Sequence, residues 1–361
     1  PNVQTDNGIN ALMLACQNGH IQIVELLKQV DPLVQSNSGS NAFIVACENG
    51  HTQIVELLLK EKVDPHVQDN NGRNAFMLAC QNGHFPVVEL LLKKQVDPNV
   101  LDINGGNAFI FALLACQNGH AKIVELLLRE KIDPNIQRKD GVNAFMLACA
   151  KGDTQIVELL IGKVNLNVRN NNGVNAFMLV CQNGHTQIVE LLLKEEVDLN
   201  VQNNDGLNAF FLACYYGQTQ TVELLLKQKI DLHVTNNDGV NAFMVACQNG
   251  HIKIVELLLK ENINPSIRRK DGGNAFILAC GKGHTQIVEI LLKKQVNPNV
   301  QTINGANAFM LACSSGHIKI VELLIGKVNL NVRNNDGVNA FMLACQNGHT
   351  EIVQLLLKET N

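Results

Sequence analysis

The chain has 361 residues, of which 46% are hydrophobic and 17% are charged, and its formal net charge is −4. It is too apolar to be disordered, and its weak negative charge excludes an overall attraction to nucleic acid or anionic lipid, so any basic site must be local. The longest apolar run, which contains Phe109 to Cys116, is far shorter than the roughly 18 residues of a membrane helix, so we expect no membrane-spanning segment.

Self-similarity at a fixed period is the strongest feature of the sequence. Each of eleven repeats carries one cysteine at the same place, at positions 16, 47, 80, 116, 149, 181, 214, 247, 280, 313 and 345. The period of about 33 residues predicts one solenoid over residues 1–361 rather than several separate domains. The opening string, Pro1 to Gln4, recurs at Pro298 to Gln301, so we expect the chain to be a fragment of a longer array.

A repeat from the middle of the chain shows the predicted elements in order. We expect a first helix that begins at Asn241, a good N-cap, and ends at Gly250, which tolerates a left-handed conformation. The second helix, Ile252 to Lys260, has a broad apolar face, and Asn264-Pro265 breaks it. The Asn-rich tract with Gly that precedes each cap is typical of a turn, so we expect a protruding loop between successive helix pairs.

Helices of about ten residues are too short to be stable alone, because isolated helices need roughly 12 to 15 residues. Each pair must therefore bury its Phe, Ala, Cys, Ile, Val and Leu residues against neighbouring pairs. The sequence thus predicts an all-α, helix–loop–helix solenoid whose stacked layers form a curved rod with a long concave surface.

The fourth repeat is longer than the others. Nine positions separate Asn107 from Cys116 where other repeats have six, so three residues within Ile110 to Leu113 are extra. Three residues are nearly one helical turn, so we expect the first helix of this repeat to lengthen and to protrude locally.

The period, the loop glycine and phrases such as Gly184-His185-Thr186-Gln187-Ile188-Val189-Glu190-Leu191-Leu192 resemble the ankyrin repeat over essentially the whole chain. Ankyrin repeats usually open the first helix with Thr-Pro-Leu-His, whereas most repeats here have Asn-Ala-Phe followed by Met or Ile. The resemblance implies a curved superhelical stack with finger-like β-turn loops. It also implies protein recognition by the loop tips and the exposed side of the first helix, without catalysis.

The cysteines and histidines recur too regularly to indicate a unique site. Neighbouring cysteines lie one layer apart, roughly 8 to 10 Å, which is beyond the reach of a disulfide. No CxxC pair or Cys–His ligand spacing is present, so we expect buried reduced thiols, no metal or other cofactor, and a reducing, cytoplasmic compartment. Nine histidines follow the helix-ending Gly, and we expect them to bond backbone groups at that turn rather than to act as acids or bases.

Positions at which the repeats differ are the candidates for partner contact. The two residues before the helix-ending Gly are Gln-Asn in six repeats, and by the resemblance they face the concave groove. In the seventh repeat these positions hold Tyr215 and Tyr216, the two tyrosines of the chain. Exposed tyrosines are frequent hot spots of protein interfaces, so we interpret this pair as the centre of a partner-binding site.

Basic residues flank the tyrosine pair at a distance of about two repeats on each side. They are Arg138, Lys139 and Lys151 of the fifth repeat, Arg169 at the start of the sixth, and Arg268, Arg269, Lys270 and Lys282 of the ninth. We expect an aromatic centre between positive patches, suited to an extended, possibly acidic peptide. The alternative is solvated charge and drift among near-duplicate repeats, because surface charges usually contribute little.

The sequence therefore favours a non-enzymatic scaffold that binds a partner protein or peptide along the groove. The alternative is a mechanical spring or spacer in a larger protein such as a channel. No Gly-rich phosphate loop or Cys/His/Asp set indicates an enzyme, and Asp140 and Asp271 within the basic loop tips disfavour nucleic acid. The last helix, Ile352 to Lys358, reads like an internal one, so we expect uncapped apolar ends that self-associate end to end.

Overall fold

A computed structural model describes residues 3–114, 120–130 and 132–359 of the chain. The described residues form α-helices joined by loops, with isolated antiparallel bridges as the β-type pairing found among them. The predicted all-α helical repeat solenoid is confirmed. The chain divides into two units of packed helices, Pro1–Ala176 and Phe177–Asn361. One continuous stack over both units stays a prediction.

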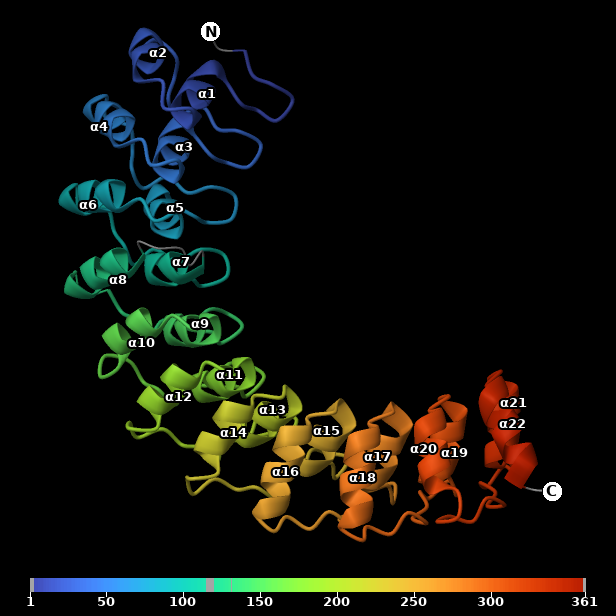
Figure 1. The fold of residues 1–361 in the computed structure, drawn as a ribbon. Coiled ribbons are helices and arrows are strands. Elements are labelled where there is room, and N and C mark those ends of the chain that lie inside the picture. The colour runs from blue at the N-terminus through green and yellow to red at the C-terminus, as the bar shows by residue number, and fades with distance from the viewer. Residues whose placement is uncertain (1–2, 115–119, 131, 360–361) are drawn as a thin grey trace. The chain divides into compact units, whose positions relative to one another are not determined.

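The described residues of the first unit form five helix pairs. They are α1 (Ala11–Gln17) with α2 (Ile21–Leu26), α3 (Ala42–Glu48) with α4 (Thr52–Lys60), α5 (Ala75–Gln81) with α6 (Phe85–Lys93), α7 (Ala108–Leu114) with α8 (His120–Arg129), and α9 (Ala144–Lys151) with α10 (Thr154–Leu160). Each odd-numbered helix packs on the next odd-numbered helix, and each even-numbered helix packs on the next even-numbered one (Figure 1). We call the odd-numbered helices the inner layer and the even-numbered helices the outer layer.

The second unit repeats the arrangement. Its pairs are α11 (Ala176–Asn183) with α12 (Thr186–Leu192), α13 (Ala209–Tyr215) with α14 (Thr219–Leu225), α15 (Ala242–Asn249) with α16 (Ile252–Lys260), α17 (Ala275–Lys282) with α18 (Thr285–Lys293), α19 (Ala308–Ser314) with α20 (Ile318–Leu324), and α21 (Ala340–Gln346) with α22 (Thr350–Glu359). From α13 to α21 each odd-numbered helix packs on the next, and the even-numbered helices from α12 to α22 do the same.

The inner helices begin and end where the sequence predicts. The side chain of Asn241 is buried, and its Oδ1 accepts a hydrogen bond from the backbone N–H of Met244 at 2.9 Å. Gly250 closes the same helix with a φ of 81°. These inner helices span seven or eight residues, fewer than expected, so their dependence on packing is greater still.

The outer helix of the same repeat ends where the sequence predicts, but proline is not the cause. Helix α16 stops at Lys260, and Asn262 then adopts a φ of 56°. This left-handed residue lets the N–H of Ile263 donate to the carbonyl of Leu258 at 3.3 Å, which satisfies an otherwise open helix end. The prediction that Asn264-Pro265 breaks the helix was therefore wrong, since the chain has already turned.

The core repeats one set of side chains, with Leu12 in place of phenylalanine in the first repeat and Thr221 in place of isoleucine in the seventh. The phenylalanine two residues after the cap is almost completely buried in the inner layer, as at Phe76 and Phe276. Ile, Val and Leu of the outer helix cover it, as at Ile254, Val255 and Leu258. Full burial of each such side chain contributes on the order of 1.5 to 3 kcal/mol, so we expect stacking to stabilise these short helices.

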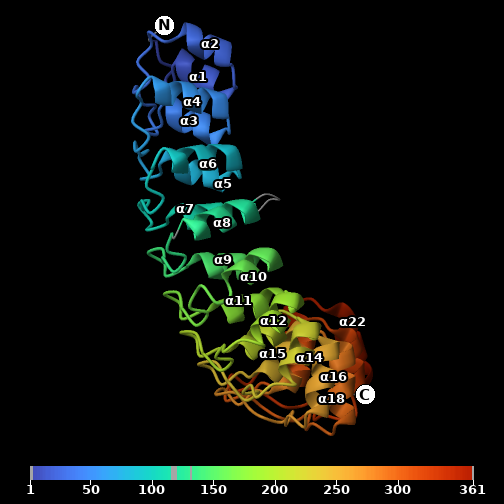
Figure 2. The ribbon, with the colours of Figure 1, turned by 90° about the vertical axis from the view of Figure 1, so that its left-hand side faces the viewer.

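The predicted protruding loops are present as hairpins. An antiparallel bridge joins Thr235 to Asn241, and the Oδ1 of Asn236 accepts from the N–H of Val240 at 2.9 Å. Successive tips are bonded to each other, since the N–H of Lys270 donates to the carbonyl of Asp238 at 2.9 Å. Figure 2 shows the hairpins of the first unit projecting from one edge of its helices.

Two further expectations concern particular repeats. Helix α7 covers Ala108–Leu114 within the described residues, and its predicted lengthening falls on residues 115–119, which lie outside them. Apolar side chains are exposed in the first and last repeats as expected, among them Leu26 (79%) and Leu357 (48%). End-to-end self-association through these repeats stays a prediction.

Candidate functional site

We define the inner-helix face by the residues seven and eight positions after each cap asparagine. In the seventh repeat these residues are Tyr215 at the end of α13 and Tyr216 directly after it, and their exposed fractions are 43% and 49%. The two rings meet edge to face, with centroids 5.0 Å apart and planes at 65°. The pair therefore presents a solvent-exposed aromatic surface where five other repeats have Gln and Asn.

Neighbouring side chains hold the backbone of the tyrosine pair in place. The carbonyl of Tyr215 accepts from the Nδ2 of Asn249 at 2.8 Å and lies 2.9 Å from the Nε2 of His251. The N–H of Tyr216 donates to the carbonyl of Leu212 at 3.0 Å. The surrounding eighth repeat thus fixes the position from which both rings project.

The bond from His251 is one member of a regular series. The Nε2 of His84 lies 2.9 Å from the carbonyl of Glu48, and that of His284 lies 2.8 Å from the carbonyl of Gln248. The expectation that these histidines bond the backbone is confirmed for these residues. They reach the carbonyl of the preceding repeat rather than their own turn, so they connect successive layers.

The fifth repeat makes the same connection with different residues. Lys151 occupies the place of Asn249, and its Nζ donates to the carbonyls of Leu113, at 2.7 Å, and Leu114. Asp153 occupies the place of His251 and instead caps α10 by accepting from the N–H of Ile156 at 3.1 Å. The ammonium of Lys151, which the sequence assigns to partner binding, is therefore engaged inside the protein.

The arginines of the basic hairpin tips are also engaged. The guanidinium of Arg269 pairs with the carboxylate of Asp271 at 2.5 Å, and that of Arg138 with Asp140 at 3.3 Å. The Nε of Arg169 donates to the carbonyl of Gly173 at 3.0 Å.

The remaining basic candidates are exposed to solvent, namely Lys139 in the first unit and Arg268, Lys270 and Lys282 in the second. Helix α15 lies between the helix of the tyrosines and that of Lys282, since α13 packs on α15 and α15 on α17. Within the second unit the aromatic and basic candidates are thus neighbouring surfaces rather than one contact cluster. The first unit contains the other basic candidates, Arg138, Lys139, Lys151 and Arg169.

A pocket of about 300 Å³, which we call the Gly106 pocket, lies between the hairpins and the inner helices of the first unit. Its floor is apolar and comes from helix α7, with Ile110, Phe111 and Leu114. Its remaining lining is mostly polar and comes from three successive hairpins and the end of α5, with Asn71, Arg73, Gln81, Asp102, Asn104, Gly106 and Arg138.

Sequence reasoning identified Arg138 as a candidate but missed the rest of this pocket. The available signal was Gly106, which stands directly before the cap where the fifth, sixth and eighth repeats have Val142, Val174 and Val240. A second signal was the long fourth repeat, which places Leu114 at the position that Gln occupies in five other repeats.

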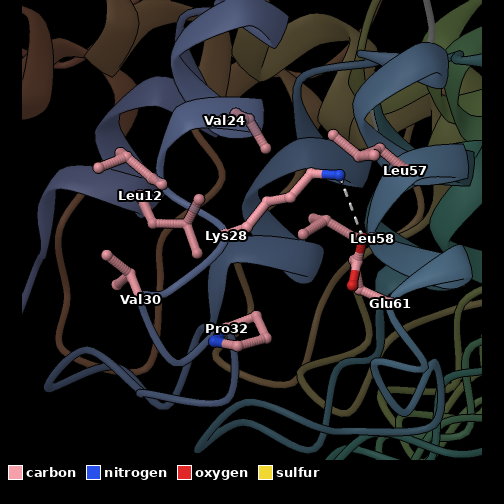
Figure 3. Close-up of a pocket in the computed structure, with 9 residues that line it drawn as sticks. Leu12, Val24, Lys28, Val30, Pro32, Leu57, Leu58 and Glu61 are labelled. Carbon is pink, nitrogen blue, oxygen red and sulfur yellow. Dashed lines mark ion pairs between the residues drawn. The ribbon is translucent and has the colours of Figure 1, made fainter.

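A smaller cavity of about 120 Å³ lies near the start of the chain, between the first two helix pairs (Figure 3). It is lined mainly by aliphatic residues, and an ion pair of 3.5 Å joins Lys28 to Glu61 at its side. Both charged side chains are about half exposed, so this pair contributes less than about 1 kcal/mol. The cavity is smaller than the roughly 300 Å³ at which ligand pockets begin, and we interpret it as a packing gap.

The described cysteines are free thiols, and they are buried with the exception of Cys345. Burial raises the pKa of the Cys16 thiol to about 12 and keeps that of Cys80 well above its ordinary value, which makes both unreactive. The expectation of burial was wrong for Cys345, because no further described helix packs on the last repeat. Cys116 lies outside the described residues.

The described residues hold neither a metal-binding cluster nor a helix fit to span a membrane. No three His, Cys, Asp or Glu side chains among them are placed to hold a metal ion. None of the described helices combines the length and the apolar character that crossing a membrane requires.

Comparison with known proteins gives one consistent relationship. A family profile described as ankyrin repeats (3 copies) matches residues 1–69, 53–114, 112–203, 177–271, 210–302 and 276–361. The crystal structure of the human ASB11 ankyrin repeat domain is similar with a TM-score of 0.54 and 23% identity, over 58% of this chain and 96% of that one. At this identity the likeness supports the fold alone. No curated protein matches the chain.

Proposed function

Because this chain belongs to the ankyrin repeat family, whose repeats are generally protein-interaction modules, we propose that it is a scaffold that binds an extended segment of a partner protein. The proposed contact surface is the inner-helix face together with the adjoining hairpins. Repeats of this family are typically non-enzymatic, and we propose that this chain acts without catalysis.

The observation that carries the proposal is the exposed Tyr215–Tyr216 pair. Nearly half of each side chain is accessible, so a partner can bury a large aromatic area there. The backbone carbonyl of Tyr215 is already fixed by Asn249 and His251, which limits the conformational entropy lost on binding. An exposed aromatic pair held in this way has no role in elastic extension, so we favour binding over the mechanical spacer.

The charge of the partner segment follows from the exposed basic residues. Arg268 and Lys270 of the ninth repeat are solvent-exposed, whereas Arg269 already pairs with Asp271. We propose that acidic residues of the segment interact with Arg268 and Lys270, and that in the first unit Lys139 has the same role. Such contacts at the edge of an interface mainly raise the association rate and its dependence on salt.

Selection of displayed random peptides on the immobilised chain tests the proposal. The Kd of each enriched peptide is then measured for the natural chain, for the double variant Tyr215→Ala/Tyr216→Ala, and for Gln346→Ala, which alters the same repeat position in the last repeat. We expect the tyrosine variant to bind at least tenfold more weakly, as for an interface hot spot, and Gln346→Ala to bind unchanged.

A second comparison tests the charge of the segment. The variant Arg268→Ala/Lys270→Ala is expected to flatten the salt dependence of the association rate. The proposal fails if no peptide is enriched over a surface without the chain, or if enriched peptides bind the tyrosine variant as tightly as the natural chain.

A further inference from the structure

We propose that the Gly106 pocket receives the side-chain carboxamide of one asparagine or glutamine of the partner segment, whose oxygen accepts a hydrogen bond from the Nε of Arg138. This inference rests on the proposed function, because it names a group that the hairpins and the inner face recognise. It concerns the first unit only, and its site is distinct from the tyrosine pair.

Arg138 stands in a hairpin whose tip sequence occurs twice in the chain. The string Arg-Lys-Asp-Gly covers residues 138–141 in the fifth repeat and 269–272 in the ninth. In both hairpins the backbone N–H of the arginine donates to the carbonyl four residues later, at 2.9 Å in the fifth repeat and 2.8 Å in the ninth. The ninth repeat is therefore a reference for the arginine of the fifth.

The two arginine side chains are bonded differently. The Nε and Nη2 of Arg269 lie 2.6 and 2.5 Å from the two carboxylate oxygens of Asp271. Arg138 makes a single contact of 3.3 Å with Asp140 through Nη2, and its Nε is buried without an acceptor among the described residues. A buried donor without a partner raises the free energy of the protein, and a guest that supplies the acceptor removes this cost.

The residue before the cap asparagine explains this difference. A Cβ at Gly273 would lie 2.9 Å from the Nε of Arg269, because this side chain folds over the glycine to reach Asp271. The fifth repeat has Val142 at the same position, and its side chain excludes this path. Arg138 instead lines the Gly106 pocket.

The preceding hairpin leaves space for a guest, because it carries Gly106 where the fifth repeat has a valine. A Cβ at Gly106 would lie 3.3 Å from the Oδ1 of Asp102 and 3.5 Å from the ring of Phe111, so a larger side chain would fill this region. The single contact with Asp140 restrains the guanidinium of Arg138 less than two contacts would. A small rotation can therefore bring its Nε–H to a guest in the pocket.

The charges around the pocket favour a neutral guest. Arg73 pairs with the buried carboxylate of Asp69 at 2.6 Å, and Arg138 with Asp140 at 3.3 Å. A third carboxylate, that of Asp102, also lines the pocket. An acidic guest would be desolvated beside this carboxylate, and a basic guest beside two guanidiniums, so either charge is disfavoured.

A carboxamide has both hydrogen-bonding functions that the pocket can use. Its oxygen is the acceptor that the Nε of Arg138 lacks, and its NH2 group can donate to the Oδ2 of Asp102, which accepts one long bond of 3.3 Å from Asn104. Asparagine and glutamine are the uncharged side chains that combine a carbonyl acceptor with two N–H donors. A volume of about 300 Å³, at the lower limit of ligand pockets, suits one such side chain.

Small probes test the pocket without any partner. The full chain is isotope-labelled at its arginine side chains and titrated with N-acetyl-glutamine N-methylamide, and separately with the same derivatives of glutamate, lysine, methionine and alanine. We expect a saturable shift of the Arg138 Nε–H NMR signal with the glutamine probe, at a Kd roughly tenfold or more below that of every other probe. The Nε–H signal of Arg269, which already has Asp271 as its acceptor, is expected to stay unshifted.

Two pairs of variants complete the test. Val142→Gly gives the fifth repeat the glycine of the ninth, so Arg138 is expected to fold back onto Asp140 and probe binding to weaken roughly tenfold. Val240→Gly, the same repeat position in the eighth repeat, leaves binding unchanged. Arg138→Lys keeps the charge but lacks the Nε–H, and it is expected to weaken binding equally even if Val142→Gly disturbs folding. Arg269→Lys is its control and leaves binding unchanged.

Several results would overturn the assignment to a carboxamide. One is equal binding of the methionine or glutamate probe, and another is undiminished binding to Arg138→Lys. Equal binding of the alanine probe would mean that the pocket takes a backbone amide instead. An Arg138 Nε–H that exchanges magnetisation with a bound water and does not respond to the glutamine probe would mean that water alone is its acceptor.

The outcome is separable from that of the peptide selection. Binding of the glutamine probe through Arg138 without any enriched peptide counts against the proposed function and leaves the pocket supported. Enriched peptides that depend on Tyr215 and Tyr216, without any response of the Arg138 signal to the probe, retain the function and remove the pocket.

Discussion

At the scale of single residues, the hydrogen bonds from one repeat to the backbone carbonyls of the preceding repeat are made by different donors in different repeats. Asn249 and His251 both reach the carbonyl of Tyr215, whereas in the fifth repeat Lys151 alone reaches the carbonyls of Leu113 and Leu114. Asp153 cannot donate to a carbonyl when ionised, so the lysine replaces both donors. Lys151 thus compensates for the donor that is lost where Asp153 stands in place of histidine.

We predict that Lys151→Ala destabilises the first unit by about 1 to 2 kcal/mol, because two carbonyls lose a charged donor. Lys282→Ala is the matched control, since His284 lies 2.8 Å from the equivalent carbonyl of Gln248 in that repeat, and a change below about 0.5 kcal/mol is expected. Hydrogen exchange of the amides of α7 and α9, compared with those of α15 and α17, measures both effects. Equal losses in the two variants would show that Lys151 has no special role.

The buried thiols predict a loss of stability at alkaline pH. Burial raises the pKa of the Cys16 thiol to about 12, from an ordinary value of 9.0, and that of Cys47 in the same direction. The folded chain keeps these protons while the unfolded chain loses them, so their contribution is full below pH 9 and falls as the pH rises from about 9 to 12. The slope is at most about 1.4 kcal/mol per pH unit for each thiol.

Urea unfolding of the natural chain and of Cys16→Ala/Cys47→Ala between pH 7.5 and 10.5 measures this dependence. The double variant removes two of the titrating thiols, so its stability should fall less steeply above pH 9. Parallel curves for the two proteins would mean that these thiols ionise equally in the folded and unfolded chain.

At the scale of elements, the helix-ending glycines couple each pair to the next. Gly250 has a φ of 81°, and a Cβ there would lie 2.6 Å from the Cε1 of His284, whose Nε2 lies 2.8 Å from the carbonyl of Gln248. The glycine therefore satisfies a backbone requirement and leaves room for the histidine of the following repeat.

We predict that Gly250→Ala costs about 2 to 3 kcal/mol, from left-handed strain and from displacement of His284. Gly348→Ala is the control, because Gly348 has a similar φ of 73° but no atom within 4 Å of its added Cβ, so strain alone should cost about 1 to 2 kcal/mol. Local free energies from hydrogen exchange of the helices that flank each glycine give both numbers. A loss for Gly250→Ala no larger than that for Gly348→Ala would contradict the coupling.

The elements themselves could be predicted from the sequence because their signals are local. The cap at Asn241 and the stop at Gly250 depend on residues within one repeat, and both are confirmed. The exposure of Tyr215 was also predictable, because a change at one repeated position is visible in the sequence.

The rest of the candidate site depends on side-chain geometry between repeats. Arg269 pairs with Asp271, and Lys151 reaches the preceding repeat, because of the directions in which their long side chains point. The spacing of residues in the sequence does not show these directions. The Gly106 pocket needs the absence of a side chain in one repeat and a short Asp102 beside it. The left-handed backbone of Asn262 was also missed. An asparagine after a helix indicates a turn, but the sequence does not show which residue of the turn is left-handed.

At the scale of the whole molecule, contacts between neighbouring repeats dominate each unit. Inner helices pack on the next inner helix and outer helices on the next outer helix, so stability should spread from repeat to repeat. A large defect in the core of one repeat is therefore expected to weaken its neighbours most and distant repeats least.

Phe76→Ala and Phe276→Ala test this with the same change at the same repeat position, because both rings are completely buried in the inner layer. Each variant is expected to lose about 3 to 5 kcal/mol locally. Amide protection should fall most in α3 to α7 for Phe76→Ala and in α15 to α19 for Phe276→Ala, and the loss should decrease with distance from the substituted repeat. A uniform loss over all helices in either variant would mean that the chain unfolds as one cooperative block, in which case the nearest-neighbour description is wrong.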